Sequence, residues 1–515
     1  MRAARSSDES AARATRNPAA GVNVAGYAAS ARRWAAAWQL TGLILPAVTV
    51  FAFHARWVSG HFSHDGYLCD SGWFAFLMEH TDPWMRNPRA VVGQACAGVN
   101  APTYLAHHLS PHLWLFGAPF SLLRVPGTDI LAYHQGLFFA LVVLAFGLVA
   151  TAVPLRLPER IPGVVAVVAV AVAGNAALQA AAYPHFEIAL IGLASLAIAA
   201  GVRGYQWLFL LSLAWLPLIR EDGGLYVTLV ALAFIAIESG DDRRGGRRCA
   251  KLALVAGLGA LASAVAFFVK ATYFPGFEAF SINFAGDGWR HVTPAFVIER
   301  VRTTLTNWNM APVLIGSLVL AAFDRRYLTG SLLLSPLLVV HMLSIRPEHG
   351  RFTLYYALPW ILAVLLWLVV LVRRMGASTA RAFEKALVAG LALTLSAPVQ
   401  ALIGTSQQSW LVVRQAFTRS VANVRLMTAF ARSVGPGGGD RGERRCASMG
   451  IAALIPDDLN PQDVINPRTD LRTCRALLLL RGDMHYEALL SRAENARFRK
   501  AMERENAELW IRTVE

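Results

Sequence analysis

Side chains that could do acid–base chemistry are concentrated in residues 61–112 of the chain. This stretch directly follows the first long apolar run of a largely apolar sequence. Ionisable groups at such a border are costly unless they are paired or line a wet cavity, so the stretch is a candidate functional site. The alternative is a solvated loop between two membrane spans. The residues concerned are His61, His64, Asp65, Asp70, Glu79, His80, Asp82, Arg86, Arg89, His107, His108 and His112.

Further polar segments interrupt the later apolar runs, at 183–187, 220–224, 273–308 and 346–351. We expect them to face the same side of the membrane as 61–112, where they would form one extracytoplasmic site. The alternative is that they are helix-end residues with ordinary interfacial roles. The candidates for binding a substrate are His185, Glu187, Arg220, Glu221, Asp222, Arg346, His349 and Arg351.

The composition is that of a membrane protein. Of the 515 residues, 55% are apolar or aromatic and 16% are charged, whereas soluble domains carry about 25% charged residues. A membrane-spanning helix needs about 20 apolar residues. The chain is therefore predicted to be an α-helical polytopic membrane protein with about eleven spans. The expected spans are 38–58, 130–152, 162–182, 184–202, 205–220, 224–238, 252–270, 311–323, 328–345, 355–372 and 385–403.

Basic residues predict the orientation. The net charge of +15 comes largely from short blocks between apolar runs, which indicates membrane orientation and contact with anionic lipid, not nucleic-acid binding. A disordered basic tail, 1–33, is expected in the cytoplasm, and the block 243–248 should lie there too. Both segments can lie in the cytoplasm only if the apolar piece 109–123 does not cross the membrane. We therefore expect a re-entrant or interfacial helix there, inside a first outer loop of 59–129, and a membrane domain of 34–403.

The remainder, 404–515, is predicted to be extracytoplasmic. Its expected parts are an amphipathic helix (407–434), a glycine-rich linker (435–439) and a small α/β domain. In that domain we expect strands at 476–480 and 509–514 and a charged helix at 485–506. No phosphate-binding glycine motif is present in this part of the sequence.

The five cysteines suit an oxidising outer side and a reducing inner side. Cys69 and Cys96 share the first outer loop, Cys446 and Cys474 share the C-terminal domain, and Cys249 is predicted to be cytoplasmic. Each outer pair is expected to form a disulfide, with two free thiols as the alternative. The histidine spacing matches no zinc pattern, so a divalent metal is allowed but not indicated, and no cofactor is identified.

Four short polar motifs follow one another along the apolar part of the chain. They are Cys69-Asp70-Ser71-Gly72, His108-Leu109-Ser110-Pro111, His185-Phe186-Glu187 and Arg220-Glu221-Asp222-Gly223-Gly224. In this order they resemble the bacterial and archaeal membrane family called domain of unknown function 2079, over roughly residues 40–400. The chain departs from the family pattern at Cys69, where an aromatic residue is usual, and at Arg220, where lysine is usual.

That family is similar to the GT-C class of membrane glycosyltransferases, which take a sugar from a polyprenyl-phosphate carrier outside the cytoplasm. The resemblance implies an inverting transfer in which Asp70, or as second choice Asp65, acts as the base. Arg220, Arg346, His349 or Arg351 would bind the leaving phosphate. The sugar pocket would be shaped by His108, His185, Glu187, Glu221 and Asp222.

Two other functions remain open from the sequence. Segments interrupted by proline and glycine, such as 215–224, resemble the broken helices of transporters, so a lipid or small-molecule flippase is one alternative. A non-catalytic membrane scaffold that presents the C-terminal domain is the other. The expected location is the bacterial inner membrane, with a cytoplasmic N-terminus and a periplasmic C-terminal domain. The expected partners are a polyprenyl-phosphate-linked sugar and membrane lipid, without nucleic acid.

Overall fold

The computed structural model describes residues 24–92, 101–153, 157–175, 177–178, 183–239, 244–276, 288–346, 354–376, 380–402, 421–434 and 444–513. The chain forms two compact units, 1–45 and 46–515. Helix α1 (Val24–His64) begins in the first unit and ends in the second. Residues 24–33, expected in a disordered tail, therefore belong to a helix, and 1–23 lie outside the described residues.

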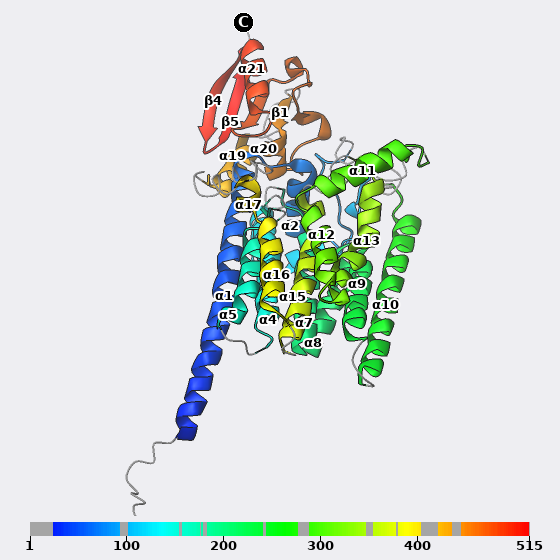
Figure 1. Cartoon of the computed structure of the whole chain (residues 1–515). Helices are drawn as coiled ribbons and strands as arrows, with labels where there is room; N and C mark the ends of the chain where they lie inside the picture. Colours follow the sequence, from blue (N-terminus) through cyan, green and yellow to red (C-terminus); the bar gives the residue numbers. More distant parts are fainter. Residues whose placement is uncertain are drawn as a thin grey trace, which may run out of the picture. The chain divides into compact units, whose positions relative to one another are not determined.

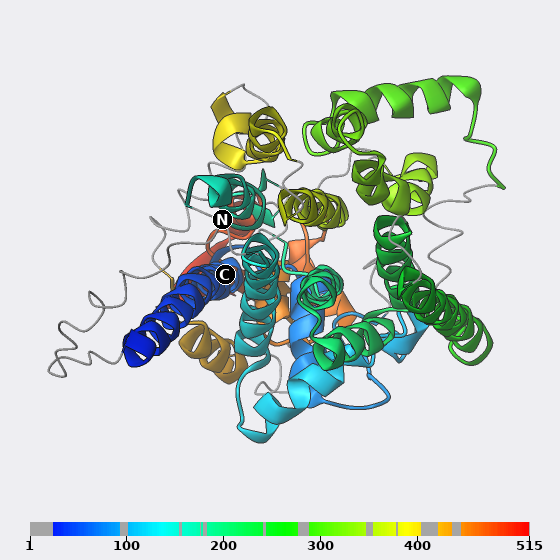
Figure 2. The same ribbon diagram turned by 60° about the horizontal axis from the view of Figure 1, so that its bottom comes forward.

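Each apolar run predicted to span the membrane contains helix in the structure, although the runs 162–182 and 385–403 are interrupted after η3 and between α16 and α17 (Figures 1 and 2). Four described helical segments are long and apolar enough to cross a bilayer, namely Gly42–His64, Gly127–Ala150, Gly246–Tyr273 and Arg325–Leu343. The chain thus has the helices of a multi-pass membrane protein. After α1, the helices of the bundle are α4 (Gly127–Ala150), α5 (Leu157–Ala166) with η3 (Val167–Val172), α7 (Ile188–Arg203), α8 (Gln206–Ile219), α9 (Gly223–Glu238), α10 (Arg244–Tyr273), α12 (Ala311–Ala321), α13 (Leu328–Leu343), α15 (Trp360–Gly376), α16 (Ala382–Thr394) and α17 (Ala397–Leu402).

The bundle is built around α15, in which every residue from 360 to 372 is buried. At its periphery α10 packs along α9 through glycines. A side chain on Gly224 would collide with the carbonyl of Gly259, so only glycine allows the two backbones to approach this closely.

Ion pairs join the helices at the end of the bundle that carries the basic loops. Glu238, at the end of α9, binds Arg248 of α10 and Arg373 of α15, at 3.2 and 3.0 Å. Arg374 binds the buried carboxylate of Glu384 at 2.7 Å. Arg248, Arg373 and Arg374 therefore lie at the same end of the helices.

Shorter helices cover the opposite end. The loop after α1 forms a π-helical turn, η1 (Leu68–Gly72), and then α2 (Trp73–His80), η2 (Tyr104–Ala106) and α3 (His112–Leu122). Helix α3 has 11 residues and lies within the segment 109–123, which the sequence predicts not to cross. Helix α11 (Pro294–Thr306) lies across the bundle end beside α12 and α13 (Figure 1).

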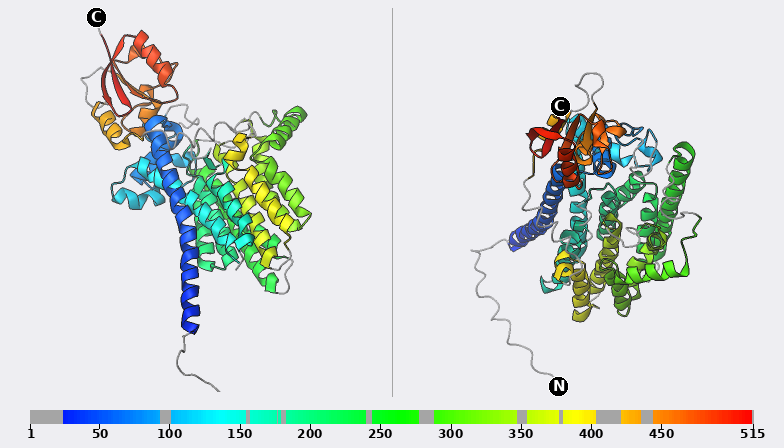
Figure 3. Two further views of the ribbon diagram at one scale, coloured as in Figure 1. Left: turned by 60° about the vertical axis from the view of Figure 1, so that its left-hand side comes forward. Right: turned by 90° about the horizontal axis from the view of Figure 1, so that it is seen from above.

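The C-terminal part contains a five-stranded sheet in the order β2-β1-β3-β5-β4 (Figure 3). Strand β1 is parallel to β2 and β3, whereas β5 is antiparallel to β3 and β4. The predicted small α/β domain is thus present. Its elements are α19 (Val424–Val434), β1 (Arg445–Ser448), α20 (Met449–Leu454), β2 (Val464–Ile465), β3 (Ala476–Leu480), α21 (Tyr486–Asn495), β4 (Phe498–Arg504) and β5 (Ala507–Arg512).

One prediction in this domain is wrong. The charged segment 485–506 is not a single helix, because α21 ends at Asn495 and the chain turns at Arg497, whose φ is 64°. The remainder becomes β4 because it pairs along its length with β5, and this pairing outweighs the helix propensity of its residues. Of the expected helix 407–434, α19 is described; residues 403–420 and the linker 435–439 lie outside the described residues.

The cysteines can be compared with their expected states. Cys446 and Cys474 form a disulfide, and Cys249 is free. Cys69 is disulfide-bonded, whereas Cys96 lies outside the described residues.

Candidate functional site

Asp70 lies on the π-helical turn η1, at the end of the bundle opposite the basic loops. Ser71 holds this turn in place, since its hydroxyl donates to the Tyr67 carbonyl at 2.8 Å and accepts from the Tyr67 backbone N–H at 3.1 Å. The hydroxyl is also 3.0 Å from His61 Nε2 of α1. Asp70 is therefore presented by a short turn whose backbone groups are bonded internally.

The environment of Asp70 favours its neutral form. Burial raises the pKa of its carboxyl, and the nearby Glu187 carboxylate raises it further, while Arg346 and His108 oppose them. The result is a pKa of about 6. Asp70 can therefore both accept and release a proton near neutral pH, as a general base must.

His108 and Glu221 form a second polar pair beside Asp70. Nδ1 of His108 donates to Glu221 Oε1 at 2.9 Å, and the Leu109 backbone N–H donates to Oε2 at 3.1 Å. Burial opposes ionisation of Glu221, but His108, this hydrogen bond and Arg220 outweigh it and lower its pKa to about 2. Glu221 is therefore a permanently ionised anchor and not a candidate base.

Arg220 is engaged by two carboxylates from different loops. It donates to Glu187 and to Asp222, with Nε 2.6 Å from Asp222 Oδ1. Glu187 is the N-cap residue of α7 and Asp222 that of α9, positions where the helix dipole favours a negative charge. Because its charge is already paired twice, Arg220 is better suited to ordering these acids than to binding a phosphate, contrary to one of the roles expected from the sequence.

Arg346 has a different position. The positive charge of its guanidinium lowers the pKa of Asp70, and its backbone N–H donates to Ser344 Oγ at 3.1 Å. No ion pair involves Arg346 within the described part of the chain. It is half-buried. Arg346 is therefore the cation that remains able to bind an anion beside Asp70.

The structure thus brings together six of the residues that the sequence predicted for the site. They are Asp70, His108, Glu187, Arg220, Glu221 and Asp222. His185 belongs with them, because its backbone carbonyl accepts from Gln135 at 2.6 Å and its Nδ1 is 3.9 Å from Glu187 Oε1.

One of the described residues expected at the site, Asp65, stands apart from this group. Asp65 lies in the turn that ends α1, where its neighbours His64 and Gly66 contact the C-terminal domain. It is not among the groups that shift the pKa of Asp70 most strongly. His349 and Arg351 lie outside the described residues.

Sequence reasoning missed Tyr104, which is completely buried among the acids of the site. Its ring packs edge-on against Trp73, with centroids 4.8 Å apart, and lies 5.5 Å from the ring of His107. Burial raises its pKa, and the charges of Glu187, Glu221 and Asp70 raise it further, so its hydroxyl stays protonated. An apolar-looking Thr103-Tyr104-Leu105 sequence gave no signal for this role.

Behind the site lies a buried pair of histidines. Trp215 Nε1 donates to His112 Nδ1 at 2.9 Å, and His112 Nε2 is 2.8 Å from His134 Nε2. Because an indole N–H can only donate, His112 must carry its proton on Nε2 and donate to His134. This network fixes the start of α3, four residues after His108.

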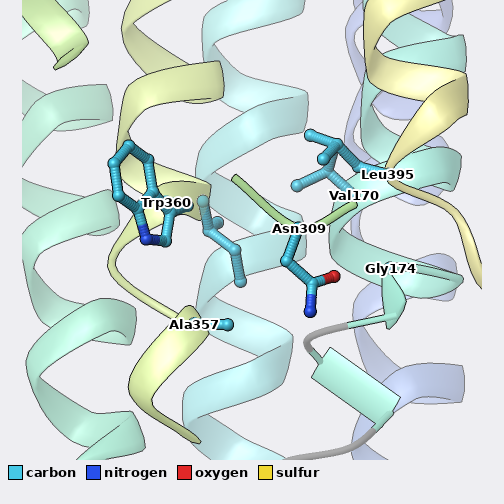
Figure 4. A pocket seen from close by; sticks show the side chains of 7 residues that line it. Val170, Gly174, Asn309, Ala357, Trp360 and Leu395 are labelled. Carbon is cyan, nitrogen blue, oxygen red and sulfur yellow. The ribbon is translucent and has the colours of Figure 1, made fainter. Parts of the chain in front are cut away.

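A small cavity lies elsewhere in the helical region, between the break after η3 and the break between α16 and α17 (Figure 4). Its volume of about 20 Å³ suits roughly one water molecule. Beside it, Asn175 donates to the Asn309 amide oxygen at 3.3 Å, and Gln400 donates to the Trp308 carbonyl at 3.0 Å. It is lined by Val170, Gly174, Asn309, Ala357, Trp360, Ile361 and Leu395.

Among the described residues, no group of three or more histidine, cysteine or acidic side chains is arranged to hold a metal ion. The histidines of the site are instead engaged with carboxylates or aromatic rings, such as His108 with Glu221.

No protein-family model and no curated protein matches the chain. Among solved structures, 94% of the chain aligns with the arabinofuranosyltransferase AftD from Mycobacteria, at a TM-score of 0.43 and 14% sequence identity. The chain covers 40% of that protein. A likeness of this strength carries no argument about activity, and the resemblance to domain of unknown function 2079 stays a prediction.

Proposed function

We propose that the chain is a membrane glycosyltransferase that uses a polyprenyl-phosphate-linked sugar on the extracytoplasmic face. The observations that carry the proposal are the raised pKa of Asp70, about 6, and the charge of Arg346, which lowers that pKa and has no ion pair among the described residues. A base and a cation able to bind an anion are what transfer from a phosphate leaving group requires.

In the proposed reaction, an acceptor hydroxyl attacks the anomeric carbon of the sugar. Asp70 takes the hydroxyl proton as the new C–O bond forms. The bond between the anomeric carbon and the phosphate oxygen breaks, and the polyprenyl phosphate leaves with that electron pair. Arg346 offsets the charge that develops on the phosphate, and attack from the face opposite the phosphate inverts the anomeric configuration.

The proposed sidedness follows from the basic loops. Arg248, Arg373 and Arg374 belong to the end of the bundle opposite Asp70. If this basic end faces the cytoplasm, as the distribution of arginine and lysine predicts, Asp70 and the disulfide-bonded C-terminal domain face outward.

A transporter is the second candidate, and one observation favours it. Two helices are interrupted side by side, where Gly174 bridges to Ser396 next to the buried amides of Asn175 and Gln400. Interrupted helices with polar groups form the substrate sites of many transporters.

One experiment separates these functions. Purified protein is reconstituted into vesicles with undecaprenyl phosphohexoses, and both sugar release or transfer and lipid movement between leaflets are measured. Transfer that is abolished in Asp70→Asn but retained in Asn175→Ala supports the enzyme. Movement of unchanged lipid between leaflets that persists in Asp70→Asn would refute the enzyme in favour of the transporter. If neither transfer nor lipid movement is detected, the result would favour the non-catalytic scaffold.

A further inference from the structure

Tyr104 carries a hydroxyl that is buried and has no hydrogen-bond partner in the described part of the chain. Burying a hydroxyl without a partner is unfavourable, so native structures rarely keep one without a reason. The neighbouring polar groups that act on it most strongly are the carboxylates of Glu187, Glu221 and Asp70, yet none accepts its proton. The site therefore holds a donor that lacks an acceptor.

The ring of Tyr104 is packed on several sides, which fixes the position of its hydroxyl oxygen. Trp73 and Phe74 stand edge-on to it, at interplanar angles of 87° and 84°, and Phe186 does so at 83°. The Tyr104 backbone N–H donates to the Met85 carbonyl at 2.8 Å. The hydroxyl is thus fixed in place before any ligand arrives, as an orienting donor should be.

The surrounding charge limits what the missing acceptor can be. Three carboxylates act on Tyr104 and a single cation, Arg220, opposes them, so a phosphate is repelled at this position, whereas a neutral hydroxyl or ring oxygen carries no such penalty. Arg346, the cation suited to a phosphate, acts on Asp70 but is not among the groups that act most strongly on Tyr104. The phosphate of a lipid-linked sugar therefore suits the position of Arg346, and a neutral oxygen of the sugar suits that of Tyr104. Asp70 interacts electrostatically with both residues.

We propose that Tyr104 is the hydrogen-bond donor of the sugar subsite and binds a neutral oxygen of the transferred sugar, while Arg346 binds the phosphate. The inference rests on the proposed glycosyltransferase function. The hydroxyl is closed off in the structure, so the sugar reaches it by displacing a neighbouring side chain. Tyr104 would then favour sugars with an oxygen at the matching position, because a sugar without it leaves the donor unpaired.

The decisive variant is Tyr104→Phe, which keeps the ring and removes only the hydroxyl. If the hydroxyl lacks a partner, its removal should raise the melting temperature of the ligand-free protein. Tyr327→Phe is the matched control. Tyr327 is equally buried, but its hydroxyl donates to Glu384 at 2.7 Å, so its loss should lower the melting temperature.

Binding is tested with undecaprenyl phosphate and with undecaprenyl phosphoglucose, phosphogalactose and phosphomannose. The unaltered protein and Tyr104→Phe should bind the sugar-free lipid with equal affinity. Tyr104→Phe should bind the preferred sugar-bearing lipid about tenfold more weakly than the unaltered protein does. A lower melting temperature for Tyr104→Phe, or equal binding of all four lipids by both proteins, would overturn the inference. Since these readouts need no turnover, they remain decisive even if no transfer is detected, a result that would count against the proposed function alone.

Discussion

Gly72, two residues after Asp70, lies against Ala453 of the C-terminal domain so closely that a Cβ on Gly72 would stand 2.6 Å from the Ala453 Cα. Gly72 has an ordinary helical φ of −67°, so it is this contact and not the backbone conformation that calls for glycine. The C-terminal domain thus packs directly behind the turn that carries Asp70. The Ala90 N–H, which donates to the Pro456 carbonyl at 2.9 Å, adds a second attachment.

Gly72→Ala should therefore loosen the docking of α20 on η1. We expect a loss of roughly 2 kcal/mol in stability, as is usual for an overpacked contact, and a fall in transfer activity because the Asp70 turn must shift. Thermal unfolding and activity of the purified protein measure both effects. Gly60→Ala in α1 is the control, since a Cβ there would meet nothing within 4 Å and alanine favours a helix. Equal behaviour of the two variants would contradict the close contact.

The disulfide between Cys446 and Cys474 links β1 to a residue two positions before β3, across a separation of 28 residues. The double substitution Cys446→Ser and Cys474→Ser should lower the free energy of unfolding of the C-terminal domain by about 3 kcal/mol. The main reason is that the unfolded chain without the cross-link has more conformations available to it. Faster proteolysis within 444–513 is the expected readout. Cys249→Ser, which removes a free thiol, should leave the cleavage rate unchanged.

Transfer activity should depend on pH through Asp70. A base works in its ionised form, and the folded-state pKa of Asp70 is raised from its usual value to about 6. Activity should thus be constant above about pH 7 and fall as the pH drops through 6, to about a tenth of the plateau at pH 5. A rate profile of the reconstituted protein checks this. A profile that stays flat down to pH 4 would exclude Asp70 as the base.

Removing Arg346 should move that profile. The guanidinium lowers the pKa of Asp70, so Arg346→Gln should raise this pKa and shift the ascending limb to higher pH. The same variant should raise KM for the lipid-linked donor about tenfold, because a phosphate contact is lost. Arg346→Lys, which keeps the charge, should retain the position of the limb. If the pH–rate profile of Arg346→Gln is not shifted, Arg346 does not act on Asp70 and is not part of the site.

Much of the site could be predicted because its charges stand at the ends of apolar runs. Glu187 and Asp222 directly precede long apolar segments, and this pattern placed them at helix starts on one side of the bundle. The pairing of Arg220 with both acids could not be read from the sequence, since it depends on how α7 and α9 pack. Tyr104 gave no signal either, because its role depends on the carboxylates that fold around it.

The fold was predictable where a pattern was long or strongly apolar. Strand β3 has the predicted bounds, since five successive apolar residues suit a strand buried on both faces. Strands β1 and β2 were missed because they contain four and two residues. The contact between Gly72 and Ala453 joins residues 381 positions apart, and no local pattern reports it.

The double engagement of Arg220 also constrains how the sequence can change over time. Glu187, Arg220 and Asp222 are largely shielded from water, so losing Arg220 leaves two carboxylates uncompensated, at a cost of about 3–5 kcal/mol for a broken buried pair, whereas losing one acid leaves Arg220 paired with the other. Among descendants of this protein, Arg220 should therefore vary less than either acid, and a lineage that replaces Arg220 with a neutral residue should also have neutral residues at 187 and 222.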